Sequence, residues 1–388
     1  MFSHRTNWRL GPNALARAIA EARGSGREIL DLAVSNPTEA GVRPAPERVL
    51  AALANPEAMH YDPQPRGVLG ARQAVSRYYR ESHNVDLDPG RLILTTSTSE
   101  AYAHIFALLC NPFDEVFVPE PSYPLFEFLA DLSDVTLVPY PLLYDHGWQI
   151  DFDSLHQSAT ARSRAVIVVH PNNPTGSYVS SAERMALNAF CRDHGLALIV
   201  DEVFLDYGHD GVPRRTFVTN ADALTFTLSG VSKISALPQM KLAWVGTSGP
   251  ENAVAEAGAR LEIIADTFLS MNAPIQLAAQ ALLDERKQIQ PVVLDRLRGN
   301  LAELDGQLAG RPSCARLQVE GGWYVVLRVP VMESDEDLAI RLLREASVSV
   351  HPGHFYDFPT EGHLVLSLIT EPAIFSKGIS RLLGAVGT

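Results

Sequence analysis

The chain of 388 residues is long enough for a large domain with a smaller companion, and its 46% hydrophobic and 20% charged residues are ordinary for a globular protein. Its 45 acidic residues outnumber the 32 basic ones, and the net charge of -13 disfavours nucleic acid and an anionic membrane as partners. Three distant cysteines suggest neither a disulfide framework nor a metal site, and no apolar run has the length of a signal peptide or a membrane span, so we expect a cytoplasmic protein.

Short β-rich runs alternate with helical stretches between about residues 90 and 250. The predicted strands are residues 91–96, 115–119, 135–139, 165–170, 196–201 and 223–228, and the predicted helices are residues 99–109, 123–132 and 181–194. This alternation predicts an α/β fold in which helices cover both faces of a mostly parallel central sheet. Ligands of such sheets bind at the carboxyl ends of the strands.

The chain becomes helical after residue 249 and then mixes the two kinds of element. Helices are predicted over residues 251–269, 274–308, 335–345 and 372–383, and strands over residues 323–329, 348–351 and 364–368. The mixture indicates a small α+β domain. The proline-rich segment of residues 35–46 is predicted to be extended and to cross between the domains.

Lys233 lies in the run Ser-Gly-Val-Ser-Lys at residues 229–233, directly after a predicted strand. An amine that is cut off from water loses part of its proton affinity and can form an imine with a carbonyl compound. Most lysines are instead exposed surface residues. Ser232 and Lys241 favour the first interpretation, because hydroxyls and a cation around one loop suit a phosphate dianion.

Two other predicted strand ends carry polar side chains. Asp201 ends the apolar run of residues 196–201, where a buried carboxylate is either half of an ion pair or a site residue. Paired with a pyridine nitrogen, it would keep that nitrogen protonated and make the ring an electron sink. The run Asn-Asn-Pro-Thr-Gly at residues 172–176 is either a turn or the place where Asn173 presents its amide to a ligand oxygen.

Hydroxyl and aromatic residues lie near the other strand ends. Residues 95–100, Thr-Thr-Ser-Thr-Ser-Glu, join a strand to a helix and form an ordinary N-cap, an anion site, or both. Tyr123 follows a further strand and either stacks on a flat ring or covers the sheet edge. Tyr61 precedes the sheet and by itself is an ordinary loop tyrosine.

From about Asp31 to Ser367, these motifs in this order resemble the aspartate aminotransferase superfamily, the class I and II aminotransferases of fold type I, which use pyridoxal 5'-phosphate. The resemblance implies that Lys233 binds this cofactor covalently and moves a proton between the substrate Cα and the cofactor C4′. It implies the following further contacts: Asp201 with the pyridine nitrogen, Asn173 with the phenolic oxygen, Tyr123 with the ring face, Thr98, Ser99, Ser229, Ser232 and Lys241 with the phosphate, and Tyr61 with the phosphate in a neighbouring subunit.

The same resemblance implies a homodimer whose subunit has two domains. The large cofactor-binding domain is expected at residues 46–275, and the small domain at residues 1–45 and 276–388. The implied activity is ping-pong transfer of an amino group between a small amine or amino acid and a keto acid. A lyase, racemase or decarboxylase of the same fold is the first alternative, because the same electron sink serves those reactions. A ligand-sensing homologue without catalysis is disfavoured, since the chain is acidic and has no room for a DNA-binding module.

Three residues depart from the usual family pattern. Lys241 stands where the family usually has arginine, so phosphate binding loses a bidentate partner. Phe204 replaces a tyrosine that donates to the phenolic oxygen, which predicts a raised pKa for the imine nitrogen. Val365 replaces the arginine that binds the substrate carboxylate. The substrate then lacks a carboxylate at that position, or another cation binds it, with Arg328, His351 and His354 as the candidates.

Overall fold

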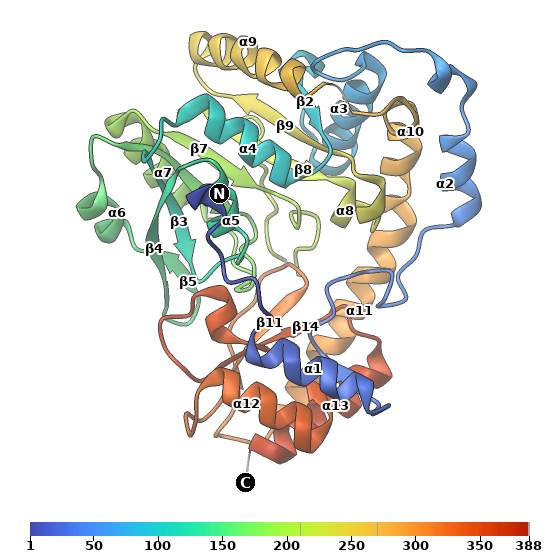
Figure 1. Cartoon of the computed structure of the whole chain (residues 1–388), viewed down its shortest axis with the longest axis vertical. Helices are drawn as coiled ribbons and strands as arrows, with labels where there is room; N and C mark the ends of the chain where they lie inside the picture. Colours follow the sequence, from blue (N-terminus) through green and yellow to red (C-terminus); the bar gives the residue numbers. More distant parts are fainter. Residues whose placement is uncertain (210, 270, 387–388) are drawn as a thin grey trace.

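The computed structural model describes residues 1–209, 211–269 and 271–386, and a large sheet forms the upper part of the molecule (Figure 1). Its strands follow the order β2-β9-β8-β7-β6-β3-β4-β5. Their bounds are β2 (Leu92–Thr95), β3 (Glu115–Glu120), β4 (Thr136–Tyr144), β5 (Trp148–Ile150), β6 (Ser163–Val169), β7 (Ala197–Asp201), β8 (Thr225–Gly230) and β9 (Ala243–Ser248). The strands from β8 to β4 pair in parallel, β9 is antiparallel to both neighbours, and β5 forms a hairpin with β4. The predicted α/β fold with a mostly parallel sheet is confirmed.

Helices cover both faces of this sheet. One face packs against α4 (Thr98–Leu109), α5 (Phe126–Leu132) and α9 (Glu251–Phe268), and the other against α6 (Phe152–Ser158) and α7 (Ser181–His194). In β6, Ile167 enters the first core, whereas Val166 and Val168 enter the second. Burial on both sides explains why this strand is apolar throughout.

A third helical layer lies beside β2 and β9, around the buried Trp244. It contains α2 (Pro46–Leu53), α3 (Leu69–His83) and α10 (Ala273–Asp284). The helix predicted over residues 274–308 is divided in two, because α10 ends before Glu285 and α11 (Arg286–Leu308) begins after it. Glu285 is buried and accepts two hydrogen bonds from Arg48, at 2.7 and 2.8 Å. Neither proline nor glycine marks this junction, so the sequence pattern did not reveal it.

The lower part of the molecule combines the two ends of the chain (Figure 1). Its sheet has the order β10-β11-β14-β13, with β10 (Ala315–Arg316), β11 (Tyr324–Arg328), β13 (His351–Pro352) and β14 (His363–Ser367). Its helices are α1 (Ala14–Gly24), α12 (Asp335–Arg341) and α13 (Pro372–Val386). The chain also has short 3-10 and π turns. The 3-10 turns are His4–Thr6, Pro56–Met59, Pro89–Arg91, Pro238–Met240 and Gly353–Tyr356, and the π turn is Leu342–Ala346.

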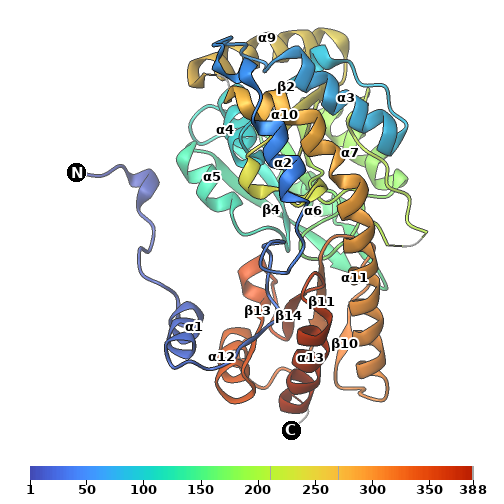
Figure 2. The same ribbon diagram turned by 90° about the vertical axis from the view of Figure 1, so that its right-hand side faces the viewer.

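A parallel pair ties the N-terminal segment to the C-terminal one. In it, β1 (Leu30–Asp31) lies beside β12 (Val348–Ser349). Helix α11 runs from the helices of the large sheet down into this lower part (Figure 2). We propose the expected division into a large domain of residues 46–275 and a small domain of residues 1–45 and 276–388, with the rest of α10 moved to the large domain, because the whole of that helix packs beside β2 and β9; the β1–β12 pairing supports the union of the two chain ends. Residues 387 and 388 of that small domain lie outside the described residues.

Candidate active site

A cavity of about 270 Å³ lies at the carboxyl ends of β6, β7 and β8. Of the ten residues assigned to a cofactor from the sequence, seven line it: Thr98, Ser99, Tyr123, Asn173, Asp201, Ser232 and Lys233. They come from separate strand ends and from the first turn of α4, so the parallel sheet brings them together.

Lys233 provides the amine of this cavity. It belongs to the four-residue helix α8 (Val231–Ile234), which follows β8 directly. Its Nζ lies 5.4 Å from the ring centre of Phe204 and 4.9 Å from that of Trp323. Burial lowers the pKa of Lys233 from 10.5 to about 8, against the opposing charge of Asp201. At pH 7 about a tenth of such amines are neutral, against roughly 0.03% of lysines with an ordinary pKa.

Asp201 provides a buried carboxylate and is only 9% exposed. Its Oδ1 accepts a hydrogen bond from the Val203 N–H at 3.1 Å, and its Oδ2 accepts one from the Tyr102 hydroxyl at 3.4 Å. Burial raises the pKa of Asp201 from 3.8 to about 6, and these two hydrogen bonds and Lys233 oppose the shift. A carboxylate in this state gains stability from a cationic partner such as a protonated ring nitrogen.

The two neighbouring asparagines after β6 differ in their hydrogen bonds. Asn172 donates to the Pro121 carbonyl and to the Thr175 hydroxyl, both at 3.0 Å, and accepts from the Ser122 hydroxyl at 3.3 Å. Asn173 is 8% exposed and its Oδ1 is buried without a hydrogen-bond partner. Since buried polar atoms are nearly always paired, Asn173 is the residue whose amide is left for a ligand.

Hydroxyls gather where α4 begins. Ser97 is the N-cap, and its hydroxyl accepts from the Glu100 N–H at 3.1 Å. Thr98 and Ser99 are the next two residues and line the cavity. The first turn of a helix has unpaired N–H groups and the positive end of the helix dipole, so this corner suits a phosphate. The structure thus confirms the N-cap, and the anion site at the same corner stays a prediction.

Three of the ten assigned residues do not line the cavity of this chain. Ser229 is buried and donates to the Glu202 carbonyl at 3.4 Å. Lys241 is exposed, with a left-handed backbone (φ 53). Tyr61 is 75% exposed and lies in a loop. Ser229 is therefore committed to the sheet, whereas Lys241 and Tyr61 present their side chains to the outside.

The candidates for binding a substrate carboxylate, His351 included, also stay outside the cavity. Arg328 is exposed and lies opposite His363 of β14 at the end of β11. It is four residues from Tyr324, which lines the cavity. Strand geometry separates those two Cα atoms by about 13 Å. His354 is exposed and packs against Phe355. The structure does not bring any of these candidates together with Lys233.

Several cavity residues were not identified from the sequence. Tyr102 follows Ser99 by three positions in α4, a spacing that places both side chains on one helix face and could have indicated it. Ser35 and Tyr324 enter the cavity from the two ends of the chain. No local pattern marks them, because only the tertiary fold brings those segments to the large sheet.

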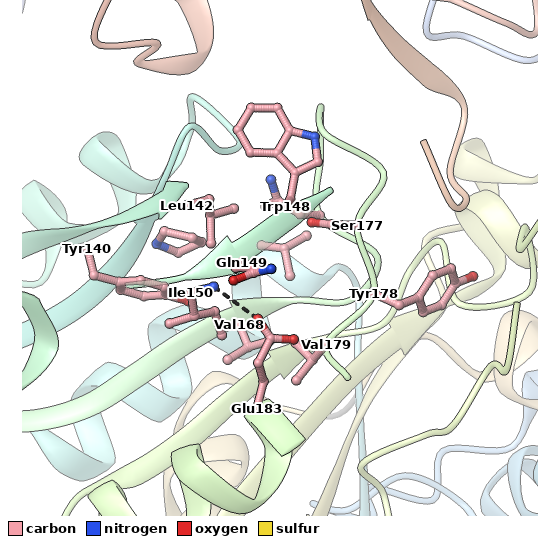
Figure 3. Close-up of a pocket in the computed structure, with 13 residues that line it drawn as sticks. Tyr140, Leu142, Trp148, Gln149, Ile150, Val168, Ser177, Tyr178, Val179 and Glu183 are labelled. Carbon is pink, nitrogen blue, oxygen red and sulfur yellow. Dashed lines mark hydrogen bonds between the residues drawn. The ribbon is translucent and has the colours of Figure 1, made fainter. Parts of the chain in front are cut away.

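A second, smaller hollow lies between β4, β5 and the segment after β6 (Figure 3). Its volume is about 20 Å³, which is room for about one water molecule. Glu183 points into it, and its two oxygens accept from the N–H groups of Ile150 at 3.0 Å and Ser180 at 2.8 Å. The charged group of this hollow is therefore used by the fold itself. Within the described ranges, no cluster of acidic, histidine or cysteine residues could hold a metal ion, and no helix could cross a membrane.

Comparisons with known proteins agree with this geometry. The model of the family "aminotransferase class I and II" matches residues 27–373. The glutamate-pyruvate aminotransferase AlaA of Haemophilus influenzae is 26% identical over 92% of this chain and 90% of its own length. The alanine aminotransferase of Mycobacterium tuberculosis is 28% identical over 94% of this chain and 86% of its own length. The structure of an alanine aminotransferase from Pyrococcus furiosus has a TM-score of 0.88 at 23% identity and covers 100% of both chains, which shows a shared fold.

Proposed function

The chain belongs to the class I and II aminotransferases and is an enzyme that transfers amino groups; from that premise we propose that it binds pyridoxal 5'-phosphate in the cavity around Lys233. The observation that carries the proposal is the set of unmet groups that meet there. These are an amine of lowered pKa, a carboxylate of raised pKa, and the side-chain amide of Asn173, whose Oδ1 has no hydrogen-bond partner and which the fold therefore does not use.

This donor set fits the cofactor group by group. Lys233 would bind the aldehyde, Asp201 would pair with the ring nitrogen, and the side-chain amide N–H of Asn173 would donate to the phenolic oxygen. Thr98, Ser99 and Ser232 would hold the phosphate at the start of α4 and α8. Tyr123, whose ring packs edge-on against Phe126 at 6.0 Å, would cover one face of the ring. Lys241, which follows α8 and is exposed, is proposed as a further phosphate contact, whereas Ser229, whose hydroxyl donates to the Glu202 carbonyl, is not.

The bound cofactor supplies a carbonyl that takes up the amino group and a protonated ring that accepts the electron pair released at the substrate Cα. Asp201 would keep that ring nitrogen protonated. With its lowered pKa, the Lys233 amine would be neutral often enough to accept the proton of the substrate Cα. Phe204 and Trp323 pack beside the lysine Nζ and limit access of water to it.

We further propose a homodimer in which Tyr61 contacts the phosphate of the neighbouring subunit. Tyr61 is 75% exposed, and Met59, two residues before it, is 91% exposed. Phe268 and Leu269 are each 67% exposed. A second copy would bury these apolar side chains. Sedimentation of the purified protein should give a dimer. The Tyr61→Phe variant should bind the cofactor more weakly and remain a dimer. A stable monomer that binds the cofactor fully would contradict this assembly.

For the amino donor, we propose a compound without a carboxylate on the carbon that bears the amine. Among the described residues that line the cavity, Lys233 is the one cationic side chain. Val365 is 1% exposed and pairs with Val326 and His351 in the small sheet, and burial lowers the pKa of His351, which favours its neutral form. A buried carboxylate without a cationic partner costs several kcal/mol. The relatives named for alanine, glutamate and pyruvate act on carboxylates, so this donor would set the chain apart.

The test is a half-reaction with donor alone. The cofactor-loaded enzyme is mixed with matched donors, alanine against alaninol and glutamate against carboxylate-free amines, and the pyridoxamine form of the cofactor and the carbonyl product are measured. We expect both products from a carboxylate-free amine and roughly hundredfold slower conversion of alanine. Equal or faster conversion of alanine would contradict the donor class. Loss of carbon dioxide or racemisation without pyridoxamine phosphate would contradict transamination as the main reaction.

A further inference from the structure

The short helix that carries Lys233 does not satisfy all the backbone carbonyls at its C-terminal end with its own N–H groups. Helix α8 has four residues, and an isolated helix of that length is far below the stable range. The carbonyl of Ile234 would normally accept from the N–H four residues later, but that residue is Pro238, which has none. The Leu237 N–H instead donates to the Val231 carbonyl at 3.1 Å. The Ala236 N–H donates to the Lys233 carbonyl at 3.3 Å, so it is the Ile234 carbonyl that depends on a donor from outside this segment.

Two side chains from other parts of the chain donate hydrogen bonds to the end of this helix. The hydroxyl of Tyr207 donates to the carbonyl of Lys233 at 2.6 Å, and the Nε2 of Gln290 donates to the carbonyl of Ile234 at 3.2 Å. Tyr207 is fully buried and packs against Trp323, with ring centres 5.2 Å apart. Gln290 belongs to α11, the helix that runs between the upper and lower parts of the molecule (Figure 2).

A buried carboxylate determines which way the amide of Gln290 points. Its Nε2 also donates to Oδ2 of Asp206 at 2.6 Å. Because the Ile234 carbonyl and this carboxylate both only accept hydrogen bonds, the amide nitrogen and not its oxygen must face them. Asp206 is held in turn by the Tyr78 hydroxyl at 3.1 Å and by Nε2 of His83 at 3.0 Å. Both N–H groups of Gln290 are thus used, one on each side.

We propose that Gln290, oriented by Asp206, is a positioning residue that fixes α8 and so keeps the amine of Lys233 directed into the cavity. The inference rests on the proposed function, in which Lys233 binds the cofactor aldehyde. Gln290 touches neither the cavity nor the reacting atoms, and it acts through the backbone next to the lysine. Reactive groups must be held to within fractions of an ångström, so a released α8 lowers the rate of covalent bond formation more than it lowers binding.

The test separates covalent capture from binding. The apo-proteins of wild type, Gln290→Met and the control Gln288→Met are mixed with pyridoxal phosphate. In capture, the Lys233 amine replaces the aldehyde oxygen and one water leaves; borohydride at timed intervals then traps the bond for mass mapping. Binding is measured separately with pyridoxine phosphate, which lacks the aldehyde. Gln288 is exposed on the same helix, so its variant controls for substitution in α11.

We expect Gln290→Met to slow capture at Lys233 about tenfold while its dissociation constant for pyridoxine phosphate stays within about twofold of wild type. Gln288→Met should match wild type in both. Asp206→Asn, whose side-chain oxygen still accepts from Gln290, should slow capture less than Gln290→Met does. If Gln290→Met does not fold, Gln290→Asn, whose shorter amide cannot reach both acceptors, takes its place.

Wild-type capture rates in the folded Gln290 variant would overturn the inference, as would an equal loss of capture and of pyridoxine phosphate binding, which is the mark of a general structural role. A wild-type protein that binds pyridoxine phosphate but forms no bond at Lys233 would contradict the proposed function and not only the role of Gln290.

Discussion

Two cavities lie near the carboxyl ends of the same sheet, and they differ in how their polar groups are used. In the hollow of about 20 Å³, the carboxylate of Glu183 accepts two backbone N–H groups and closes the N-terminal cap of α7. In the cavity of about 270 Å³, burial shifts the pKa values of Lys233 and Asp201, and the Oδ1 of Asn173 has no partner. Unmet polar groups, and not a hollow alone, distinguish a reactive site from a structural one.

The largest predicted effect compares the transamination rate after Lys233 is replaced in the larger cavity with the rate after Glu183 is replaced in the smaller one. Lys233→Met should abolish covalent cofactor binding and lower the transamination rate by about a thousandfold or more, because the proton carrier is lost. Glu183→Gln should leave the rate within about twofold and lower the free energy of unfolding by about 1 kcal/mol through the weakened cap. Steady-state rates and denaturant titrations of both variants check this. A Glu183→Gln enzyme without activity would remove the contrast.

Asp201→Asn should lower the rate about a hundredfold, because the ring nitrogen loses the partner that keeps it protonated. Steady-state rates of the loaded variant check this.

The same substitution should raise the free energy of unfolding of the apo-protein at high pH. The pKa of Asp201 in the folded protein, about 6, lies above the ordinary 3.8, so its contribution to stability is present below pH 3.8 and lost as the pH rises through 6. At pH 8 the variant should be more stable than wild type by roughly 1–3 kcal/mol, and this gain should disappear near pH 4. Equal free energies of unfolding of the variant and wild type at pH 8 would show that burial does not destabilise the ionised carboxylate of Asp201.

The neighbouring asparagines give the same contrast at smaller scale. Asn172→Ala should cost about 2 kcal/mol of stability, because three buried hydrogen bonds are lost. Asn173→Ala should leave stability nearly unchanged and weaken the affinity for pyridoxine phosphate about tenfold. Thermal unfolding and a binding titration separate the two effects. If Asn173→Ala were the less stable variant, its amide would belong to the fold.

The smallest predicted effect concerns Phe204, whose ring lies 5.4 Å from Lys233 Nζ. Phenylalanine cannot donate a hydrogen bond to the phenolic oxygen, so the cofactor-bound lysine nitrogen should keep its proton to higher pH than in a Phe204→Tyr variant. The visible absorption band of the loaded protein should therefore titrate about one pH unit lower in the variant. A wild-type band already deprotonated at neutral pH would contradict this reading of Phe204.

Much of the fold could be predicted from the sequence because local signals and burial agree there. The predicted helix over residues 181–194 has those bounds in the structure, since the capping box of Ser180 and Glu183 starts it and the left-handed Gly195 ends it. The division between α10 and α11 could not be predicted, because it is accompanied by no backbone signal but by ion pairs of the buried Glu285 and Arg286 with residues far away in the sequence.

The site divides in a similar way. Residues at strand ends, such as Asp201 and Asn173, could be found because the parallel sheet gathers them at one edge. Ser229 could not be separated from Ser232 by sequence, since only the direction of each side chain decides which one reaches the cavity. Gln290 is 57 residues from Lys233 along the chain, and its contact exists only after α11 has packed against α8.

Covalent capture by the apo-protein tests the central claim most directly. The chain has four lysines, Lys233, Lys241, Lys287 and Lys377, so three of them serve as internal controls. Pyridoxal phosphate is added near pH 7, the bond is reduced with borohydride, and the peptides are mapped by mass spectrometry across a pH series. We predict modification of Lys233 alone, with a rate that rises with pH and levels off near pH 8, the pKa that burial gives this amine. Modification of the exposed Lys241, or equal modification of all four lysines, would contradict the account.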